Sequence, residues 1–222
     1  MKFIYNIFFL IYIYIIIIMT FEYLKEKNLK IRPIDEKLLD IFDFINSTYS
    51  INIYESRLLE IGIGIGNKSI ELSKLFSSYY GIEPDIELYN RLTNLCEKNK
   101  CKIKHFNMDF NTFVKFTDKK FNIIFLENVI HFIDFEIFIK KVKKIFNKYE
   151  SGFILIKNPR IKPYNWGNKE FCKDSELFNE KKWIIFREKL KLIYEKLNNS
   201  KYLIKIYTTE YSYYFVFYLI NN

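Results

Sequence analysis

Residues 57–66 read RLLEIGIGIG, and this run indicates how the chain folds around a ligand. An apolar stretch containing Glu60 is followed by glycines at every second position, Gly62, Gly64 and Gly66. Glycine has no Cβ, so it adopts positive φ angles and lets a ligand approach the backbone closely. A helical pattern begins after Asn67, and a helix N-terminus offers unpaired N–H groups. The run therefore predicts a strand, a glycine turn and a helix that bring bare backbone against a small polar ligand.

The composition is typical of one globular domain. The chain has 222 residues, of which 50% are hydrophobic and 19% aromatic, enough for a sizeable core. Its net charge of +9 can attract nucleic acid, anionic lipid or acidic metabolites. The lysines are scattered, however, and no RNA-binding signature accompanies them. A solvated surface enlarged by AT-rich codon usage is therefore favoured over a nucleic-acid partner, which stays a disfavoured alternative.

Cysteine usage predicts neither a metal site nor a disulfide framework. Cys96, Cys101 and Cys172 do not have the spacing of metal ligands, and their number is odd. We expect Cys96 and Cys101 to be reduced residues that flank a turn, which favours a reducing compartment.

The N-terminal segment is strongly apolar from residue 3 to residue 18. Extended to Phe21, it reaches the range of about 17–25 residues that spans a bilayer. It lacks the small-residue cleavage site of a signal peptide, and basic residues are denser after it than before it, which places the rest of the chain in the cytoplasm. Residues 1–20 are thus predicted as a hydrophobic segment that anchors the chain to a membrane through residues 3–19. The alternative is that Met19 is the true start.

Downstream, apolar runs alternate with amphipathic helical patterns, which is the order of parallel βαβ units. A helix around residues 38–45 precedes the first strand, and a hairpin of β-rich residues closes the chain. Strands are expected at 57–61, 79–82, 103–106, 121–126, 152–157, 202–207 and 211–220, and helices at 67–77, 84–97, 134–147 and 175–197. The predicted fold class is α/β: a doubly wound, mostly parallel seven-stranded sheet with a C-terminal antiparallel hairpin and helices on both faces.

Acidic residues stand at four expected strand ends: Glu60, Glu83, Asp109 and Glu127, the last beside Asn128. Doubly wound sheets bind ligands at the carboxyl ends of their strands. A single carboxylate there often just caps the next helix, but four of them beside a glycine turn indicate a binding site. Such acceptors suit a ligand that carries a cationic centre, a ribose diol and an amine.

These residues resemble the motifs of the class I S-adenosylmethionine-dependent methyltransferases. Residues 60–66 are similar to the first motif of that family, residues 81–84 to the second, 107–109 to the adenine-side motif and 121–124 to the fourth-strand motif. Residues 127–134 resemble the type 11/12 small-molecule branch, whereas Asn122 departs from the usual Asp. A nicotinamide fingerprint is disfavoured, because Asn67 stands where its third glycine is required.

The resemblance implies S-adenosylmethionine as cofactor and a site for it. Glu83 would accept hydrogen bonds from the ribose hydroxyls, Asp109 would accept one from the adenine amine, and Glu60 would support the amino end. The implied cofactor-binding residues are Glu60, Gly62, Gly64, Gly66, Ile82, Glu83, Met108, Asp109, Glu127 and Asn128.

The predicted function is methyl transfer to an oxygen, nitrogen or carbon of a small molecule, with an RNA or protein methyltransferase or a non-catalytic binding module as alternatives. His131 would serve as a base for an acceptor that carries a proton; alternatively it packs against the following helix. Residues 21–222 would form the methyltransferase domain, with the cofactor half at about 56–157 and substrate-side elements at 21–55 and 158–222.

Overall fold

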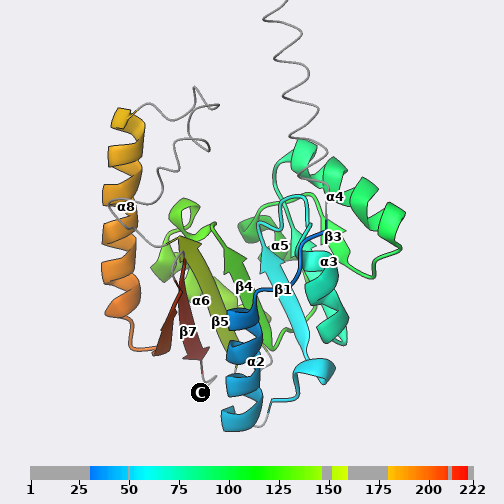
Figure 1. The fold of residues 1–222 in the computed structure, drawn as a ribbon, viewed down its shortest axis with the longest axis horizontal. Coiled ribbons are helices and arrows are strands. Elements are labelled where there is room, and N and C mark those ends of the chain that lie inside the picture. Colours follow the sequence, from blue (N-terminus) through cyan, green and yellow to red (C-terminus); the bar gives the residue numbers. More distant parts are fainter. Residues whose placement is uncertain (1–30, 50, 147–151, 160–179, 210–211, 220–222) are drawn as a thin grey trace, which may run out of the picture.

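The computed structural model describes residues 31–49, 51–146, 152–159, 180–209 and 212–219 (Figure 1). The strands of these residues form one seven-stranded sheet in the order β3-β2-β1-β4-β5-β7-β6. Strands β1 to β5 run parallel, and β7 is antiparallel to both β5 and β6. The predicted fold class is confirmed. The strands are β1 Arg57–Ile61, β2 Ser78–Ile82, β3 Lys104–Phe106, β4 Ile123–Glu127, β5 Gly152–Pro159, β6 Leu203–Thr208 and β7 Ser212–Leu219.

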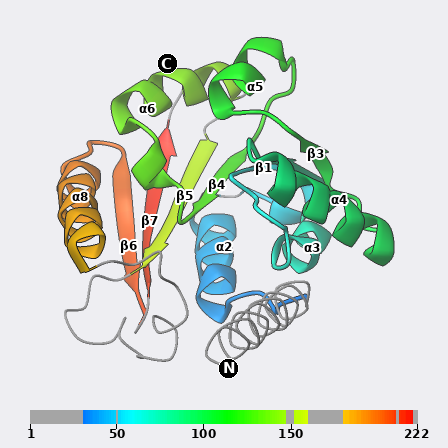
Figure 2. The ribbon, with the colours of Figure 1, turned by 90° about the horizontal axis from the view of Figure 1, so that it is seen from above.

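Helices cover both faces of this sheet (Figure 2). One core lies between the sheet and α2, α3 and α4, and a second lies between the sheet and α5, α6 and α8. The α-helices are α2 Glu36–Tyr49, α3 Ser69–Leu72, α4 Ile86–Asn99, α5 Phe110–Phe116, α6 Phe135–Ile145 and α8 Glu180–Asn198, and the 3₁₀ turns are η1 Ile53–Glu55, η2 Ser73–Leu75 and η3 Ile130–Phe132.

The central strands are buried on both faces, because helices cover both sides of the sheet, and so they contribute apolar side chains to both cores. Leu58 and Ile123 belong to the α2–α4 core, whereas the next residues along their strands, Leu59 and Ile124, belong to the α5–α8 core. Successive side chains of a strand point to opposite faces. The continuous apolar runs of the sequence are therefore the runs that a doubly covered parallel sheet requires.

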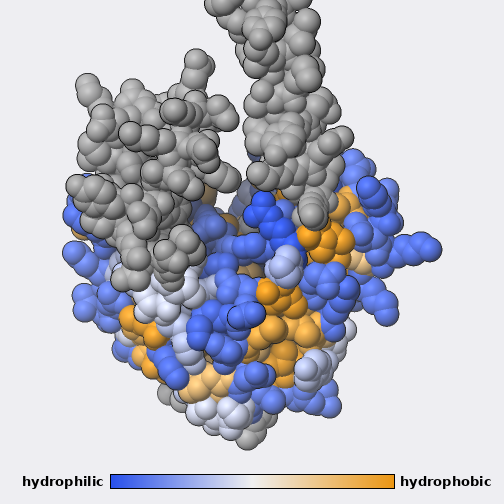
Figure 3. All heavy atoms as spheres, in the orientation of Figure 1, coloured by the Kyte–Doolittle hydropathy of each residue, from blue (hydrophilic) through white to orange (hydrophobic). Residues whose placement is uncertain are grey.

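The outer surface is mixed in character. In Figure 3 hydrophilic side chains cover much of the face that carries α2, and a smaller hydrophobic area lies between α2 and α3.

The cysteine prediction is wrong. Cys96 and Cys101 are joined by a disulfide at the turn after α4. Lys100 ends that helix in the left-handed region, with φ at 49°, and the Cys101 N–H donates to the Cys96 carbonyl at 3.0 Å. This turn brings the two Cα atoms to 4.9 Å. The pairing removes the support that these residues gave to a reducing compartment.

The predicted membrane segment, residues 1–20, lies outside the described residues. Within the part of the chain that the structure describes, no helix has the length and apolar character needed to cross a bilayer.

Candidate cofactor site

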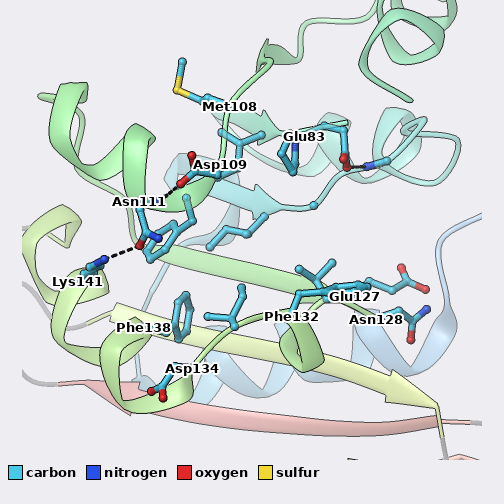
Figure 4. A pocket seen from close by; sticks show the side chains of 18 of the residues that line it. Glu83, Met108, Asp109, Asn111, Glu127, Asn128, Phe132, Asp134, Phe138 and Lys141 are labelled. Atoms are coloured by element: carbon cyan, nitrogen blue, oxygen red, sulfur yellow. Dashed lines mark hydrogen bonds between the residues drawn. The ribbon is translucent and has the colours of Figure 1, made fainter. Parts of the chain in front are cut away.

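A cavity of about 760 Å³ lies at the carboxyl ends of β1, β2 and β4. The chain passes from β1 outward to β2 and β3, and then returns to β4 on the other side of β1. This reversal is the switch point at which doubly wound sheets bind ligands. Met108, Asp109 and Glu83 lie along one side of the cavity, and Glu127, Asn128 and Phe132 lie along the opposite side (Figure 4).

The glycine turn has the conformation that the sequence predicts. Gly62, Gly64 and Gly66 have φ angles of +70°, +58° and +71°, a region that residues with a Cβ adopt only under strain. Gly62 and Gly64 line the cavity. A Cβ on Gly64 would meet nothing within 4 Å, whereas one on Gly66 would come within 2.4 Å of Leu92 in α4. Gly64 is thus open toward a ligand, and Gly66 allows α4 to pack closely.

Glu83 follows β2 directly and is buried at the wall of the cavity. One carboxylate oxygen, Oε2, accepts the N–H of Gly64 at 2.8 Å, and the other, Oε1, accepts the N–H of Asp85 at 3.0 Å. Each carboxylate oxygen has two lone pairs. Both oxygens therefore keep an acceptor position for donors of a ligand.

Asp109 has two roles. It lines the cavity, and it also caps α5, which begins at the next residue. Its Oδ1 accepts the N–H groups of Asn111 and Thr112, and its Oδ2 accepts the Thr112 hydroxyl at 2.7 Å. These bonds, that of the Thr112 hydroxyl first, lower the pKa of Asp109. The carboxylate is thus ionised and held at the rim of the cavity.

Much of the cavity wall is apolar. Ile82 and Met108, two of the residues expected at the cofactor, line it. Four apolar residues of η3, α6 and the link between them also line it: Phe132, Ile133, Ile137 and Phe138. Phe132 is 78% exposed. The sequence did not predict this second group of lining residues. Apolar residues dominate the run after β4, and this run is the sequence signal for an apolar cavity wall. A helix face that is buried in the core has the same pattern, so the sequence does not distinguish the two.

Glu127 and Asn128 form a polar end of the cavity. The Oε1 atom of Glu127 is 2.5 Å from the Nζ of Lys68 and 3.2 Å from the Nζ of Lys157. Asn128 has a φ of +58°, and its N–H donates to the carbonyl of Lys157 at 2.8 Å. The left-handed backbone at Asn128 turns the chain away from β4 and into the cavity wall.

Three predicted site residues do not line the cavity: Glu60, Gly66 and His131. Glu60 is buried and accepts the Tyr79 hydroxyl at 2.7 Å. Burial raises the pKa of Glu60 to about 7, although hydrogen bonds from Ser69 and Tyr79 oppose the shift.

His131 lies in η3, which packs against α8. Its ring centroid is 4.0 Å from that of Phe132. Burial, and then the positive charge of Lys189, lower the pKa of His131, so its imidazole is neutral at pH 7. Asn122, the departure from the family pattern, directly precedes β4 at the amino-terminal end of the parallel strands, away from the cavity, and its Oδ1 accepts the Arg57 N–H at 2.9 Å.

Comparison with known proteins agrees with this geometry. Residues 58–148 match the family described as a methyltransferase domain. No curated protein sequence matches the chain. Among solved structures, an S-adenosylmethionine-dependent methyltransferase from Aquifex aeolicus has 15% identity and a TM-score of 0.55, covering 79% of this chain and 88% of that chain.

Two further structures have the same fold. A Staphylococcus aureus protein proposed to be a caffeoyl-CoA O-methyltransferase has 12% identity and a TM-score of 0.59, covering 90% of both chains. A Haemophilus influenzae protein proposed to be a methylase has 17% identity and a TM-score of 0.53, covering 85% of this chain and 90% of that chain. The family match covers residues 58–148, and the three solved structures share the fold of this chain.

Proposed function

We propose that this chain transfers the methyl group of S-adenosylmethionine to an oxygen, nitrogen or carbon atom of a small molecule. The observation that carries the proposal is the buried carboxylate of Glu83, which faces the cavity beside the open backbone of Gly64. Carboxylates in such a place accept charge-assisted hydrogen bonds from a diol.

The described residues fit the cofactor. Glu83 would hold the ribose, and Ile82, Met108 and Asp109 would hold the adenine. Glu127 would face the amino-acid end of the cofactor. When bound, the cofactor supplies a methyl group that is already activated on a sulfonium centre. The protein then has to align donor and acceptor and exclude water, and the apolar side chains of η3 and α6 supply the water-excluding wall.

His131 remains the proposed base for an acceptor that carries a proton. Its lowered pKa keeps the imidazole in the neutral form, which accepts protons. Because His131 lies outside the cavity and against α8, this role requires the acceptor to bind on the α8 side of η3. The substrate-side elements, residues 21–55 and 158–222, are proposed to complete the acceptor site.

Replacement of Glu83 tests the cofactor site. We expect Glu83→Ala to weaken the binding of S-adenosylhomocysteine at least tenfold, because the variant lacks both ribose acceptors, a loss of about 1.5–3 kcal/mol. Isothermal titration calorimetry measures the affinity. Glu87→Ala, which removes an exposed acid of α4, is the matched control and should leave the affinity unchanged. An unchanged affinity of the Glu83 variant would refute the ribose assignment.

Transfer itself needs a separate assay, because a non-catalytic module would bind the same ligand. We propose a screen of small molecules with a methyl-labelled donor, comparing the wild type with Gly64→Arg. The net charge of +9 is the feature that favours an RNA acceptor instead. Strong RNA binding that falls with rising salt would support that alternative.

A further inference from the structure

Lys157, at the carboxyl end of β5, is a buried cation that the proposed function does not yet use. Its side chain is 9% exposed. Its Nζ atom lies 3.1 Å from the Oδ2 of Asp35 and 3.2 Å from the Oε1 of Glu127, and 5.4 Å from the centre of the Tyr214 ring. A buried charge is costly unless it is paired, and here two carboxylates pair it.

The partners of Lys157 join elements that are far apart in the sequence. Asp35 stands at the start of α2, where its Oδ1 accepts the N–H of Lys37 at 3.0 Å. Its other oxygen accepts the hydroxyl of Tyr214, which is in β7. Burial opposes the charge on Lys157, but Glu127, Tyr214 and Asp35 outweigh it and raise the pKa of Lys157 above its ordinary value. The ammonium is therefore charged at neutral pH and is fixed from several sides.

Glu127 connects this network to the cavity. Its Oε1 atom lies between the ammonium groups of Lys68 and Lys157, which differ in how firmly they are held. Lys68 is 33% exposed, and its ion pair among the described residues is with Glu127. Lys157 is also tied to Asp35. When a new anion enters the cavity, Lys68 is thus the cation that can turn toward it, whereas Lys157 stays on Glu127.

We propose that Lys157 is a positioning residue that holds Glu127 to receive the ammonium group of the methyl donor, while Lys68 moves from Glu127 to the carboxylate of the donor. The inference rests on the proposed function and extends it to this end of the cavity. The amino-acid end of the donor carries one positive and one negative charge. Exchange of partners therefore leaves every charge of the set Lys68, Glu127, Lys157 and Asp35 paired.

Two ligands separate this role from a structural one. S-adenosylhomocysteine carries the amino-acid end, and 5′-methylthioadenosine has the nucleoside without it. We expect Lys157→Met to weaken S-adenosylhomocysteine binding at least tenfold and to change methylthioadenosine binding less than twofold, both measured by isothermal titration calorimetry. Lys68→Met should show the same selectivity. Lys201→Met, at an exposed lysine away from the cavity, is the matched control and should change neither affinity.

Other outcomes overturn the inference. Equal weakening of both ligands by Lys157→Met would show that Lys157 acts through the fold, and unchanged binding of S-adenosylhomocysteine would show that it does not position Glu127. If Lys157→Met does not fold, Asp35→Asn keeps the ammonium but loosens it, and it should weaken S-adenosylhomocysteine selectively; a non-selective or absent effect refutes the proposal. If the wild type binds neither compound, the proposed function itself fails.

Discussion

Among single residues, Glu60 carries the clearest consequence for stability. Its pKa is about 7 in the folded chain and near 4.5 in the unfolded chain, because burial disfavours the charged carboxylate. Between these values the folded chain holds a proton that the unfolded chain has released. The contribution of Glu60 to stability is therefore fully present below pH 4.5 and is lost as the pH rises through 7.

We predict that this loss is visible as a pH-dependent difference between the wild type and Glu60→Gln. Glutamine keeps an acceptor for the Tyr79 hydroxyl but does not titrate. From pH 5 to pH 8 the unfolding free energy of the wild type should fall by roughly 2 kcal/mol relative to that of the variant. Urea denaturation at a series of pH values measures it. A constant difference would contradict the assignment of a raised pKa.

Glu60 and Glu83 also illustrate what a sequence can and cannot predict about a site. Both acids stand near a strand end, and from the pattern alone they look equivalent. Glu60 lies inside β1, so its side chain points into the protein toward Tyr79 of the neighbouring strand. Glu83 is the first residue after β2 and reaches the cavity. Because side chains alternate along a strand, a shift of one or two residues decides whether a carboxylate points into the protein or reaches the cavity.

At the level of elements, the glycine turn meets two separate requirements, open space for a ligand at Gly64 and close packing of α4 at Gly66. In the sequence the two glycines look alike. Gly64 faces open space, whereas Gly66 faces Leu92 of α4, which is fully buried. An alanine at either position is strained, because both φ angles are positive. The two substitutions should nevertheless have different effects on binding and stability.

We predict that Gly64→Ala weakens S-adenosylhomocysteine binding at least tenfold and lowers the unfolding free energy by about 1–2 kcal/mol, the strain of the left-handed conformation. Gly66→Ala adds an overlap with Leu92 and should destabilise the fold more, while its folded fraction keeps most of its affinity. Calorimetric titration and urea denaturation of both variants make the comparison. The reverse ranking would show that Gly66, rather than Gly64, meets the ligand.

The order and type of the strands and long helices could be predicted because each has its own period and its own boundary residue. Asp134 caps α6 and Asp85 caps α4, close to where the sequence places these helices. The short helix α5 was missed, because the signal that starts it, Asp109, was assigned to the ligand. The helix expected at 67–77 is a single turn, α3, followed by the 3₁₀ turn η2. Local pattern does not fix how far a helix continues once tertiary packing limits it.

For the whole molecule, the described residues that line the cavity come from a limited part of the chain. They run from Ile61 to Lys141, and the charged network adds Asp35, Lys157 and Tyr214. None of these residues belongs to the predicted membrane segment, residues 1–20. We therefore propose that residues 21–222 form the methyltransferase domain on their own.

We predict that a chain starting at residue 21 binds S-adenosylhomocysteine within twofold of the full chain, as measured by calorimetric titration. Flotation with lipid vesicles tests whether residues 1–20 anchor the chain to a membrane. If they do, only the full chain should rise with the vesicles. A large loss of affinity in the shorter chain would place residues 1–20 in the working site. Equal flotation of both chains would contradict the anchor.

The position of β7 has a consequence for how the protein is made. This strand comes last among the described strands, yet it lies inside the sheet, between β5 and β6. While the chain is being synthesised, β5 therefore has an unpaired edge until residues 212–219 have emerged. An exposed edge strand is a template for aggregation. Translation that stops early would thus leave a product that aggregates, even though all the described residues that line the cavity had already been made.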